Sequence, residues 1–470
     1  MKHIFAPLLN KIRLLPFAIG AVFTFLAGRI AFTQSFPLPY DEGFHFGLIK
    51  LYTHHLNPFL ASQPAGADAY GAVARDPSYL YHYLLSFPLR LLQVLGLSEH
   101  AQILALRGLN IALGLATLYL VYRLALRLGL SQKTALLPVA ALAITPVFYA
   151  VSAQINYDNL LIGLTVLTVL MVLSVTDKLR SGAVPVAQVV ELSSLLLLAS
   201  IVKYSYLPIA LVAAVYVLAV ALKYVGLKGS FSGLFKGFRS LASVTKVLLV
   251  MLIAVSGLLW FQRDGMNVVL YHTPHPQCQA VLSVERCNSY APWARNYQLH
   301  QTVAQRPING LALGSYTKQW AKSMFVELYS TISVQGSSVV YTPYMVMCLL
   351  AAPLIALGAL LAARFAIASR RIRVYWWPLA AVSAGYVAIL WAQNYSDYHH
   401  LHFFIAVQGR YLLPVMPFVY LFTIYGYVLL AERASVEIAR IQSALLTTVE
   451  SWTVQPVTLV LRLAGALRLI

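Results

Sequence analysis

The run from Leu14 to Phe32, LLPFAIGAVFTFLAGRIAF, is followed shortly by Pro39-Tyr40-Asp41-Glu42-Gly43-Phe44-His45-Phe46. The first stretch is apolar over about the 20 residues that a helix needs to cross a bilayer. The second places two adjacent carboxylates and an imidazole at the boundary between membrane and water. If residues 40–50 are helical, Asp41 and His45 lie four positions apart and share one face. Acids in this pattern can hold a metal ion, accept a proton or bind a cationic group.

Similar apolar runs recur along the whole chain. Of the 470 residues, 60% are hydrophobic and only 10% are charged, and the mean hydropathy is +0.72. A soluble protein carries about 25% charged residues, and a membrane barrel alternates where this chain has continuous apolar runs. We therefore predict an all-α polytopic membrane protein, one integral-membrane domain over residues 1–470, with about ten (10–12) transmembrane helices. The spans are expected at 14–34, 103–124, 134–151, 158–176, 185–202, 205–222, 245–262, 343–363, 374–392 and 410–430.

The basic residues predict the orientation. The net charge is +19, but Lys and Arg are spread through short connections between spans, so no basic soluble domain remains to bind nucleic acid. The side richer in these residues is predicted to be cytoplasmic and holds both termini. The outer loops are then 35–102, 263–342 and 393–409, and 223–246 is a cytoplasmic loop that lies on anionic headgroups. The C-terminal tail 433–470 is expected at the interface, with an eleventh span at 456–470 as the alternative.

Two features of the outer loops stand out. Tyr79–Leu95 is amphipathic and is expected to form a helix that lies along the membrane interface. Cys278 and Cys287 are nine residues apart in the second outer loop, where an oxidising compartment favours a disulfide. Two free thiols are the alternative.

Four short polar segments at the outer ends of spans are candidates for one site, and each has a plain structural alternative. The acids and histidine of the first loop equally fit a solvated loop start. Turn chemistry alone explains the Asn156–Asn159 segment. Lys203 either snorkels beside its neighbouring tyrosines or pairs with a lipid phosphate. Arg410 opens the last span, where a guanidinium requires a partner such as phosphate, and aromatic anchoring is the alternative. The predicted pocket residues are Tyr40, Tyr79, His82, Asn156, Asp158, Gln408 and Tyr411.

Three of these motifs, Pro39–Phe46, Asn156–Asn159 and Gln408–Pro414, occur in an order that resembles the GT-C superfamily of integral-membrane glycosyltransferases. That superfamily includes the protein O-mannosyltransferases and the aminoarabinose transferases, and the details look closer to a bacterial group within it. The resemblance extends from residue 14 to residue 430. It is loose before the interfacial helix, where the chain has Asp76-Pro77-Ser78-Tyr79 instead of a Pro-Pro pair.

The resemblance implies a GT-C-like enzyme in the bacterial cytoplasmic (inner) membrane, with its active site on the outer (periplasmic) face. Such an enzyme takes a sugar from a polyprenyl-phosphate donor in the bilayer and passes it to a glycan, lipid or protein acceptor. Asp41 would be the general base, Glu42 would orient the acceptor hydroxyl, and His45 would be the third catalytic residue. Arg410 and Lys203 would bind the donor phosphate. No cofactor is implied with certainty, and a divalent metal ion, if one is used, would be held by Asp41 and Glu42.

A secondary transporter or flippase for a lipid-linked or small solute is the alternative function. Transporters of this kind place their polar groups near the middle of the bilayer and often consist of paired half repeats. This sequence shows no internal repeat, and its polar groups gather at the outer ends of the spans. The pattern therefore favours the enzyme.

Overall fold

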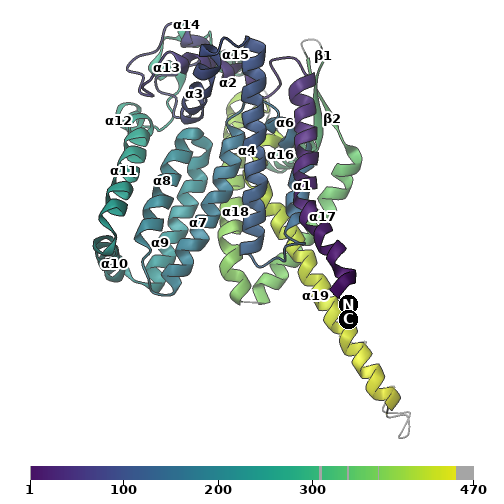
Figure 1. Ribbon diagram of the computed structural model, residues 1–470. Helices are drawn as coiled ribbons and strands as arrows, with labels where there is room; N and C mark the ends of the chain where they lie inside the picture. The colour runs from purple at the N-terminus through teal and green to yellow at the C-terminus, as the bar shows by residue number, and fades with distance from the viewer. Residues whose placement is uncertain (1, 306–309, 336–337, 369, 451–470) are drawn as a thin grey trace.

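The structure is a computed structural model that describes residues 2–305, 310–335, 338–368 and 370–450. It is a bundle of helices with a layer of shorter elements at one end (Figure 1). The bundle contains α1 (Lys2–Thr33), α4 (Glu99–Arg127), α5 (Leu136–Ala143), α6 (Pro146–Ser152), α7 (Asp158–Arg180), α8 (Val186–Val202), α9 (Leu207–Tyr224), α11 (Ser243–Trp260), α17 (Met345–Ala368), α18 (Arg370–Leu401) and α19 (Met416–Glu450). The first residues of α1 and the last of α19 lie at the same end (Figure 1).

The protein is a helical, multi-pass membrane protein. Within the described ranges, six helical segments are long and apolar enough to cross a bilayer: Leu14–Thr33, Glu99–Arg127, Asp158–Arg180, Tyr204–Tyr224, Ser243–Tyr271 and Met345–Arg364. The apolar helix α8 is shorter. The predicted count of about ten spans remains a prediction.

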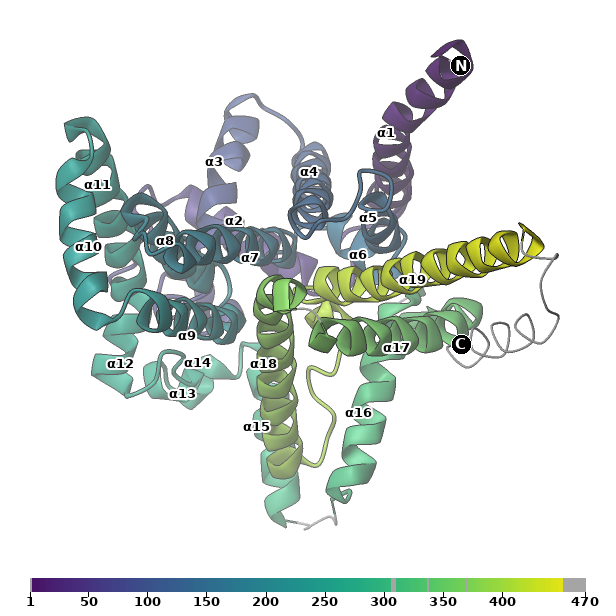
Figure 2. The same ribbon diagram turned by 90° about the horizontal axis from the view of Figure 1, so that it is seen from below.

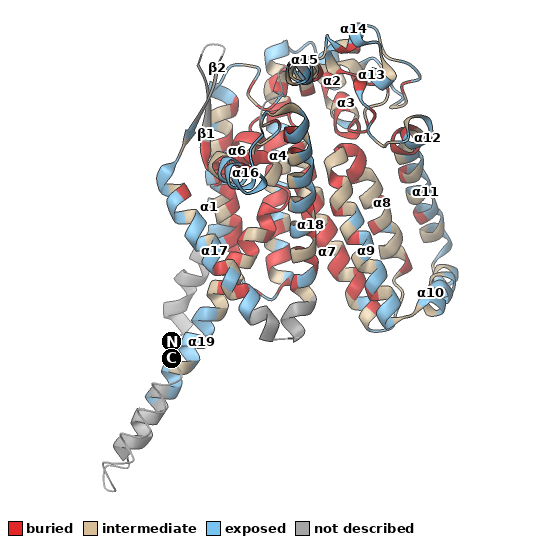
Figure 3. Cartoon of the chain, turned by 180° about the vertical axis from the view of Figure 1, so that it is seen from behind, coloured by how far each residue is buried: buried red, intermediate tan, exposed pale blue. Residues whose placement is uncertain are grey.

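α7 lies at the centre of the bundle and α11 at its edge. In the apolar window of α7, 61% of the residues are buried, whereas the corresponding share is 11% for the segment that begins with α11. α7 packs against α4, α8 and α9 (Figure 2), and buried residues concentrate on these inner helices (Figure 3). A helix that is apolar on every side yet exposed, such as α11, fits a lipid environment.

α17 and α19 approach closely through glycines. A Cβ atom on Gly426 would lie 2.0 Å from the carbonyl oxygen of Gly358, and one on Gly358 would lie 2.6 Å from that of Thr423. Small residues at such contacts let two helix backbones meet, which is a common way for helices to associate in membranes.

The helices differ from the predicted spans and loops in several places. The expected span 134–151 is interrupted between α5 and α6, because Pro146 cannot continue the hydrogen-bonding of the preceding helix. The expected loop 393–409 is helical up to Leu401, where α18 ends, and α19 begins only at Met416, after the expected start of its span. The predicted cytoplasmic loop 223–246 contains a helix, α10 (Leu227–Ser240), and α19 carries the chain as a helix to Glu450. The predicted interfacial or spanning segment 456–470 lies outside the described residues.

The opposite end of the molecule, called the outer end below, carries α2 (Glu42–Thr53), α3 (Leu80–Val94), and the elements of the long second loop. α3 matches the predicted interfacial helix within one residue at each end. The second loop and its flanks contain α12 (Met266–Tyr271), α13 (Cys278–Val281), α14 (Val284–Cys287), α15 (Ala291–Gln305) and α16 (Leu313–Leu328). Single turns are η1 (Ala67–Tyr70), η2 (Tyr204–Tyr206), η4 (Gly409–Leu412) and the π-helical turn η3 (Phe261–Gly265).

The regular structure of the described residues is almost entirely helical, as predicted, and one short hairpin is the exception. Strands β1 (Ser330–Gln335) and β2 (Ser338–Pro343) form an antiparallel hairpin in which Ser330 pairs with Pro343. Strands are favoured over a helix here by the β-branched residues Thr331, Ile332, Val334, Val339 and Val340.

Candidate functional site

The first and the last of the three sequence motifs meet at one ion pair. Arg410, in η4, places Nη2 2.7 Å from Oδ2 of Asp41, which precedes α2. The Asp41 side chain is 58% exposed, whereas that of Arg410 is 5% exposed. The Asp41 carboxylate is therefore accessible to solvent, and the cation that it pairs with is buried.

An unusual backbone supports this pair. Tyr40 and Asp41 both have positive φ, 68° and 70°, in the left-handed region that non-glycine residues rarely adopt. The carbonyl of Tyr40 accepts from Arg410 Nη1 at 3.0 Å and from Asn156 Nδ2 at 2.9 Å. Strained residues of this kind often cluster at functional sites. The middle motif, through Asn156, thus joins the first and the last at a single carbonyl.

A second buried ion pair lies beside the first. Lys203, at the end of α8, donates from Nζ to Oδ1 of Asp158, the first residue of α7, at 2.7 Å. Lys203 Nζ lies 4.8 Å from the ring centroid of Tyr411, and Arg410 Cζ lies 5.0 Å from the same centroid. Tyr411 therefore holds both cations by cation–π contact.

The two cations predicted to bind phosphate are thus adjacent, but each already contacts a carboxylate. Some hydrogen-bonding capacity remains. Arg410 Nε and Asp158 Oδ2 are buried and have no hydrogen-bond partner among the described residues. A buried donor without a partner is costly, so Arg410 is suited to take up an anion.

Glu42 does not have the predicted surroundings. Its side chain is fully buried and forms a fork-to-fork pair with Arg107 on α4, with Nε 2.8 Å from Oε1 and Nη2 2.7 Å from Oε2. The backbone N–H groups of Leu38 and Ile155 donate to the same two oxygens at 2.7 and 3.2 Å. The carboxylate is therefore saturated. The prediction that Glu42 orients the acceptor or holds a metal ion is wrong, and Glu42 instead fixes the loop that carries Asp41.

The site also does not fit a divalent ion. With Glu42 saturated and Asp41 paired with Arg410, the two acids cannot share a metal. In the part of the chain that the structure describes, no group of three His, Cys, Asp or Glu side chains has the arrangement that would hold one.

His45 and His82 form a buried pair between α2 and α3. His82 Nδ1 lies 3.1 Å from the carbonyl oxygen of Ser78 and must donate to it, since a carbonyl only accepts. Neutral His82 then accepts at Nε2 from His45 Nδ1, 2.9 Å away. The lone pair of His45 is therefore on Nε2.

Burial sets the protonation of both imidazoles. It lowers the pKa of His82 to about 4. Burial, followed by the field of His82 and of the cations Arg410 and Lys203, lowers the pKa of His45 well below its usual value. Both rings are thus neutral at neutral pH, and the His45–His82 pair lies next to the two cations without adding charge.

Of the remaining predicted pocket residues, Tyr40 and Gln408 lie at the site and Tyr79 does not. Tyr40 lies in the site, with its ring centroid 4.7 Å from Arg410 Cζ. Tyr79 does not, because its hydroxyl donates to the carbonyl of Leu259 at 3.1 Å and its ring faces Arg263, so its placement in the pocket was wrong. Gln408 precedes η4, and its backbone carbonyl accepts from the N–H of Tyr411.

Two residues of the site were missed by the sequence analysis. Arg107 lies inside a predicted span, and a charge there is a sign of a buried partner. Glu327, at the end of α16, accepts from Tyr40 Oη at 3.1 Å and from the N–H of Gly409 at 3.1 Å. No pattern in the sequence indicates Glu327, because it is far from both partners in the chain.

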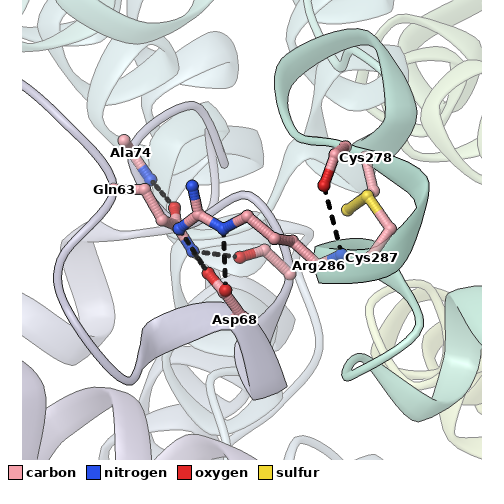
Figure 4. The surroundings of a disulfide bond; sticks show 8 residues. Gln63, Asp68, Ala74, Cys278, Arg286 and Cys287 are labelled. Atoms are coloured by element: carbon pink, nitrogen blue, oxygen red, sulfur yellow. Dashed lines mark hydrogen bonds and ion pairs between the residues drawn. A yellow bond between two sulfur atoms is a disulfide. The ribbon is translucent and has the colours of Figure 1, made fainter.

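The second outer loop packs over this region. Cys278 and Cys287 are bonded to one another, and Arg286 beside them makes a two-point pair with Asp68 of the first loop at 2.7 and 2.8 Å (Figure 4). The hydrogen bonds from Arg286 lower the pKa of Asp68. Further along, His275 stacks on Tyr204, next to Lys203, with ring centroids 4.4 Å apart. The second outer loop therefore covers part of the site and is joined to the first outer loop by the Arg286–Asp68 pair.

No known family model matches the chain, and no curated protein is significantly similar to it in sequence.

Proposed function

We propose that this protein is a membrane glycosyltransferase that moves a sugar from a polyprenyl-phosphate donor to an acceptor at the outer end of the bundle. One observation supports this proposal above the others. Three motifs that are more than 100 residues apart in the chain meet around the Tyr40 carbonyl, where an exposed carboxylate, Asp41, faces a buried cation, Arg410.

The charges suit the reaction. In the transfer, an acceptor hydroxyl oxygen forms a bond to the anomeric carbon while the bond from that carbon to the phosphate oxygen breaks. The electron pair of the broken bond stays on the phosphate, which gains negative charge. Arg410 and Lys203, adjacent across Tyr411, would stabilise that charge. Asp41 would take the proton of the acceptor hydroxyl.

The Asp41–Arg410 pair implies competition. A carboxylate and a phosphate are both anions that a guanidinium binds in the same way. Donor binding to Arg410 would therefore release Asp41 from its partner and leave it available as a base. His45 and Glu42 act behind the site, as a neutral neighbour and as an anchor of the loop.

The position of these groups supports an enzyme over a transporter. Asp158 begins α7, Lys203 ends α8 and Arg410 precedes α19, so each lies at a helix end. A lipid-linked donor has its tail in the bilayer and its head at this level. We place the reaction on the outer face of a bacterial cytoplasmic membrane because the connections at the other end carry most of the Lys and Arg.

The proposal is tested with the full-length protein in proteoliposomes, using radiolabelled polyprenyl-phosphate sugars as donors and an envelope extract as the source of acceptors. We expect Asp41→Asn to lower the rate of transfer by about 10² to 10⁴, as loss of a general base does. Asp68→Asn is the matched control, since it removes an outer carboxylate that pairs with an arginine but lies away from Arg410. Full transfer by Asp41→Asn would reject the base. Movement of the donor across the proteoliposome bilayer without any transfer of sugar would indicate the flippase instead.

A further inference from the structure

A cavity of about 410 Å³ lies beside α16, next to the proposed site. This volume is in the range of small-molecule sites. Five of its seven lining residues have polar side chains, and the other two, Val326 and Pro343, are apolar; the polar ones are Gln319, Lys322, Ser323, Glu327 and Ser330. Sequence analysis did not single out any of these residues, and the proposed transfer chemistry does not use the cavity.

The cavity wall is one face of a fixed helix. Gln319, Lys322, Ser323 and Glu327 recur at helical spacing. The adjacent face of α16 is held in the core, where Tyr316 stacks on Phe404 and Trp320 Nε1 donates to Asn394 Oδ1 at 3.0 Å. Ser330 and Pro343, which pair at one end of the hairpin β1–β2, also line the cavity. Figure 3 shows α16 beside α6. The polar face is therefore presented by a rigid scaffold.

Glu327 connects the cavity to the reacting pair. Its two carboxylate oxygens accept from Tyr40 and Gly409, the residues that immediately precede Asp41 and Arg410. The helix lies so close to Gly409 that a Cβ atom there would be 2.4 Å from the N atom of Leu328. Burial also raises the pKa of Glu327, against the hydrogen bonds from Gly409 and Tyr40. Glu327 thus lines the cavity and also hydrogen-bonds to the two residues that are adjacent in the chain to Asp41 and Arg410.

We infer that this cavity binds the acceptor and that the acceptor presents a sugar or another hydroxyl-rich group to it. The inference rests on the proposed function. The lining offers hydroxyl, amide, carboxylate and ammonium groups, which together satisfy hydroxyls that both donate and accept. An apolar acceptor would leave these groups without partners, at a cost in affinity. In the proposed reaction the donor phosphate binds to Arg410 and Lys203, and the acceptor reaches Asp41 from the cavity beside α16.

Thiol protection in the full-length protein tests this inference without measuring transfer. Cys348 is buried and the other two cysteines are bonded to each other, so the native chain gives little background labelling. Gln319→Cys and Ser323→Cys each place an accessible thiol in the cavity. Thr317→Cys, on an exposed part of the same helix outside the cavity lining, is the control.

D-Glucose, D-galactose and D-glucuronate are the probes, each used up to about 50 mM because a ligand with so few contacts binds weakly. We expect at least one of these sugars to slow maleimide labelling of Gln319→Cys and Ser323→Cys by about threefold or more, because a bound sugar shields the thiol. The labelling rate of Thr317→Cys should not change. Equal labelling with and without each sugar in both cavity variants would overturn the inference. Protection without sugar transfer would leave the cavity as a sugar site and reject the proposed function. Transfer without protection would do the opposite.

Discussion

Glu42 and Asp264 are both fully buried carboxylates, yet their surroundings are opposite. Glu42 accepts four hydrogen bonds, two of them from Arg107. Asp264, in η3, has no hydrogen-bond partner on either carboxylate oxygen among the residues that the structure describes. Burial of a charge is tolerated when it is paired and is costly when it is not. The same neutralising substitution should therefore have opposite effects at the two positions.

We predict that Glu42→Gln lowers the stability of the folded protein by about 3–5 kcal/mol, because it leaves the buried Arg107 without a countercharge. The melting temperature of the detergent-solubilised protein measures this. Asp177→Asn is the control, because it breaks ion pairs with Arg127 and Arg180 that are only partly buried and should cost less than about 1 kcal/mol. Equal losses in the two variants would show that the Glu42–Arg107 pair does not anchor the loop.

We predict that Asp264→Asn leaves the melting temperature unchanged or raises it. The substitution removes an unpaired charge from the interior and keeps the shape of the side chain. The same melting measurement checks it against Glu42→Gln. A loss of stability as large as that of Glu42→Gln would contradict the absence of a stabilising partner.

At the scale of elements, the contact between α2 and α3 depends on two neutral histidines. His45 and His82 are each 1% exposed and share one hydrogen bond. If both rings were protonated, His82 Nε2 would no longer accept, and two donors would face each other. The α2–α3 contact should therefore weaken in acid.

We predict that stability falls as the pH is lowered from 6.5 toward 4. In this range the unfolded imidazole of His82 binds a proton and the folded one, with its pKa lowered to about 4, does not. More protons are bound in the unfolded state, so stability decreases with decreasing pH, by up to about 1.4 kcal/mol per pH unit for this residue. His82→Gln, which removes the titrating group, should flatten the dependence of melting temperature on pH. Parallel curves for the two proteins would contradict the assignment.

Elements were predicted better than their ends. Apolar length indicated α1, α4, α7, α9, α11 and α17, and amphipathic spacing indicated α3. The break at Pro146 and the extension of α18 to Leu401 were missed, since hydropathy alone does not report where hydrogen bonding stops. The hairpin was missed because its β-branched residues were read as part of a polar loop.

On the scale of the whole molecule, the sequence indicated which segments carry polar groups, and the structure places three of them together. What the sequence could not indicate is pairing. Asp41 and Glu42 are neighbours in the chain, but the helix start at Glu42 directs one carboxylate to Arg410 and the other to Arg107. Periodicity does not distinguish these two directions, because both partners come from distant segments of the chain.

The central claim is that the donor phosphate and Asp41 compete for Arg410. The most direct measurement is the equilibrium affinity of the full-length protein for polyprenyl phosphate, compared between the native chain, Asp41→Asn and Arg410→Gln. We predict that Asp41→Asn binds about 2- to 10-fold more tightly, since it removes a partly exposed ion pair worth about 0.5–1.5 kcal/mol, although it transfers sugar much more slowly. Arg410→Gln should bind more weakly. Unchanged or weaker binding of polyprenyl phosphate by Asp41→Asn would contradict the account.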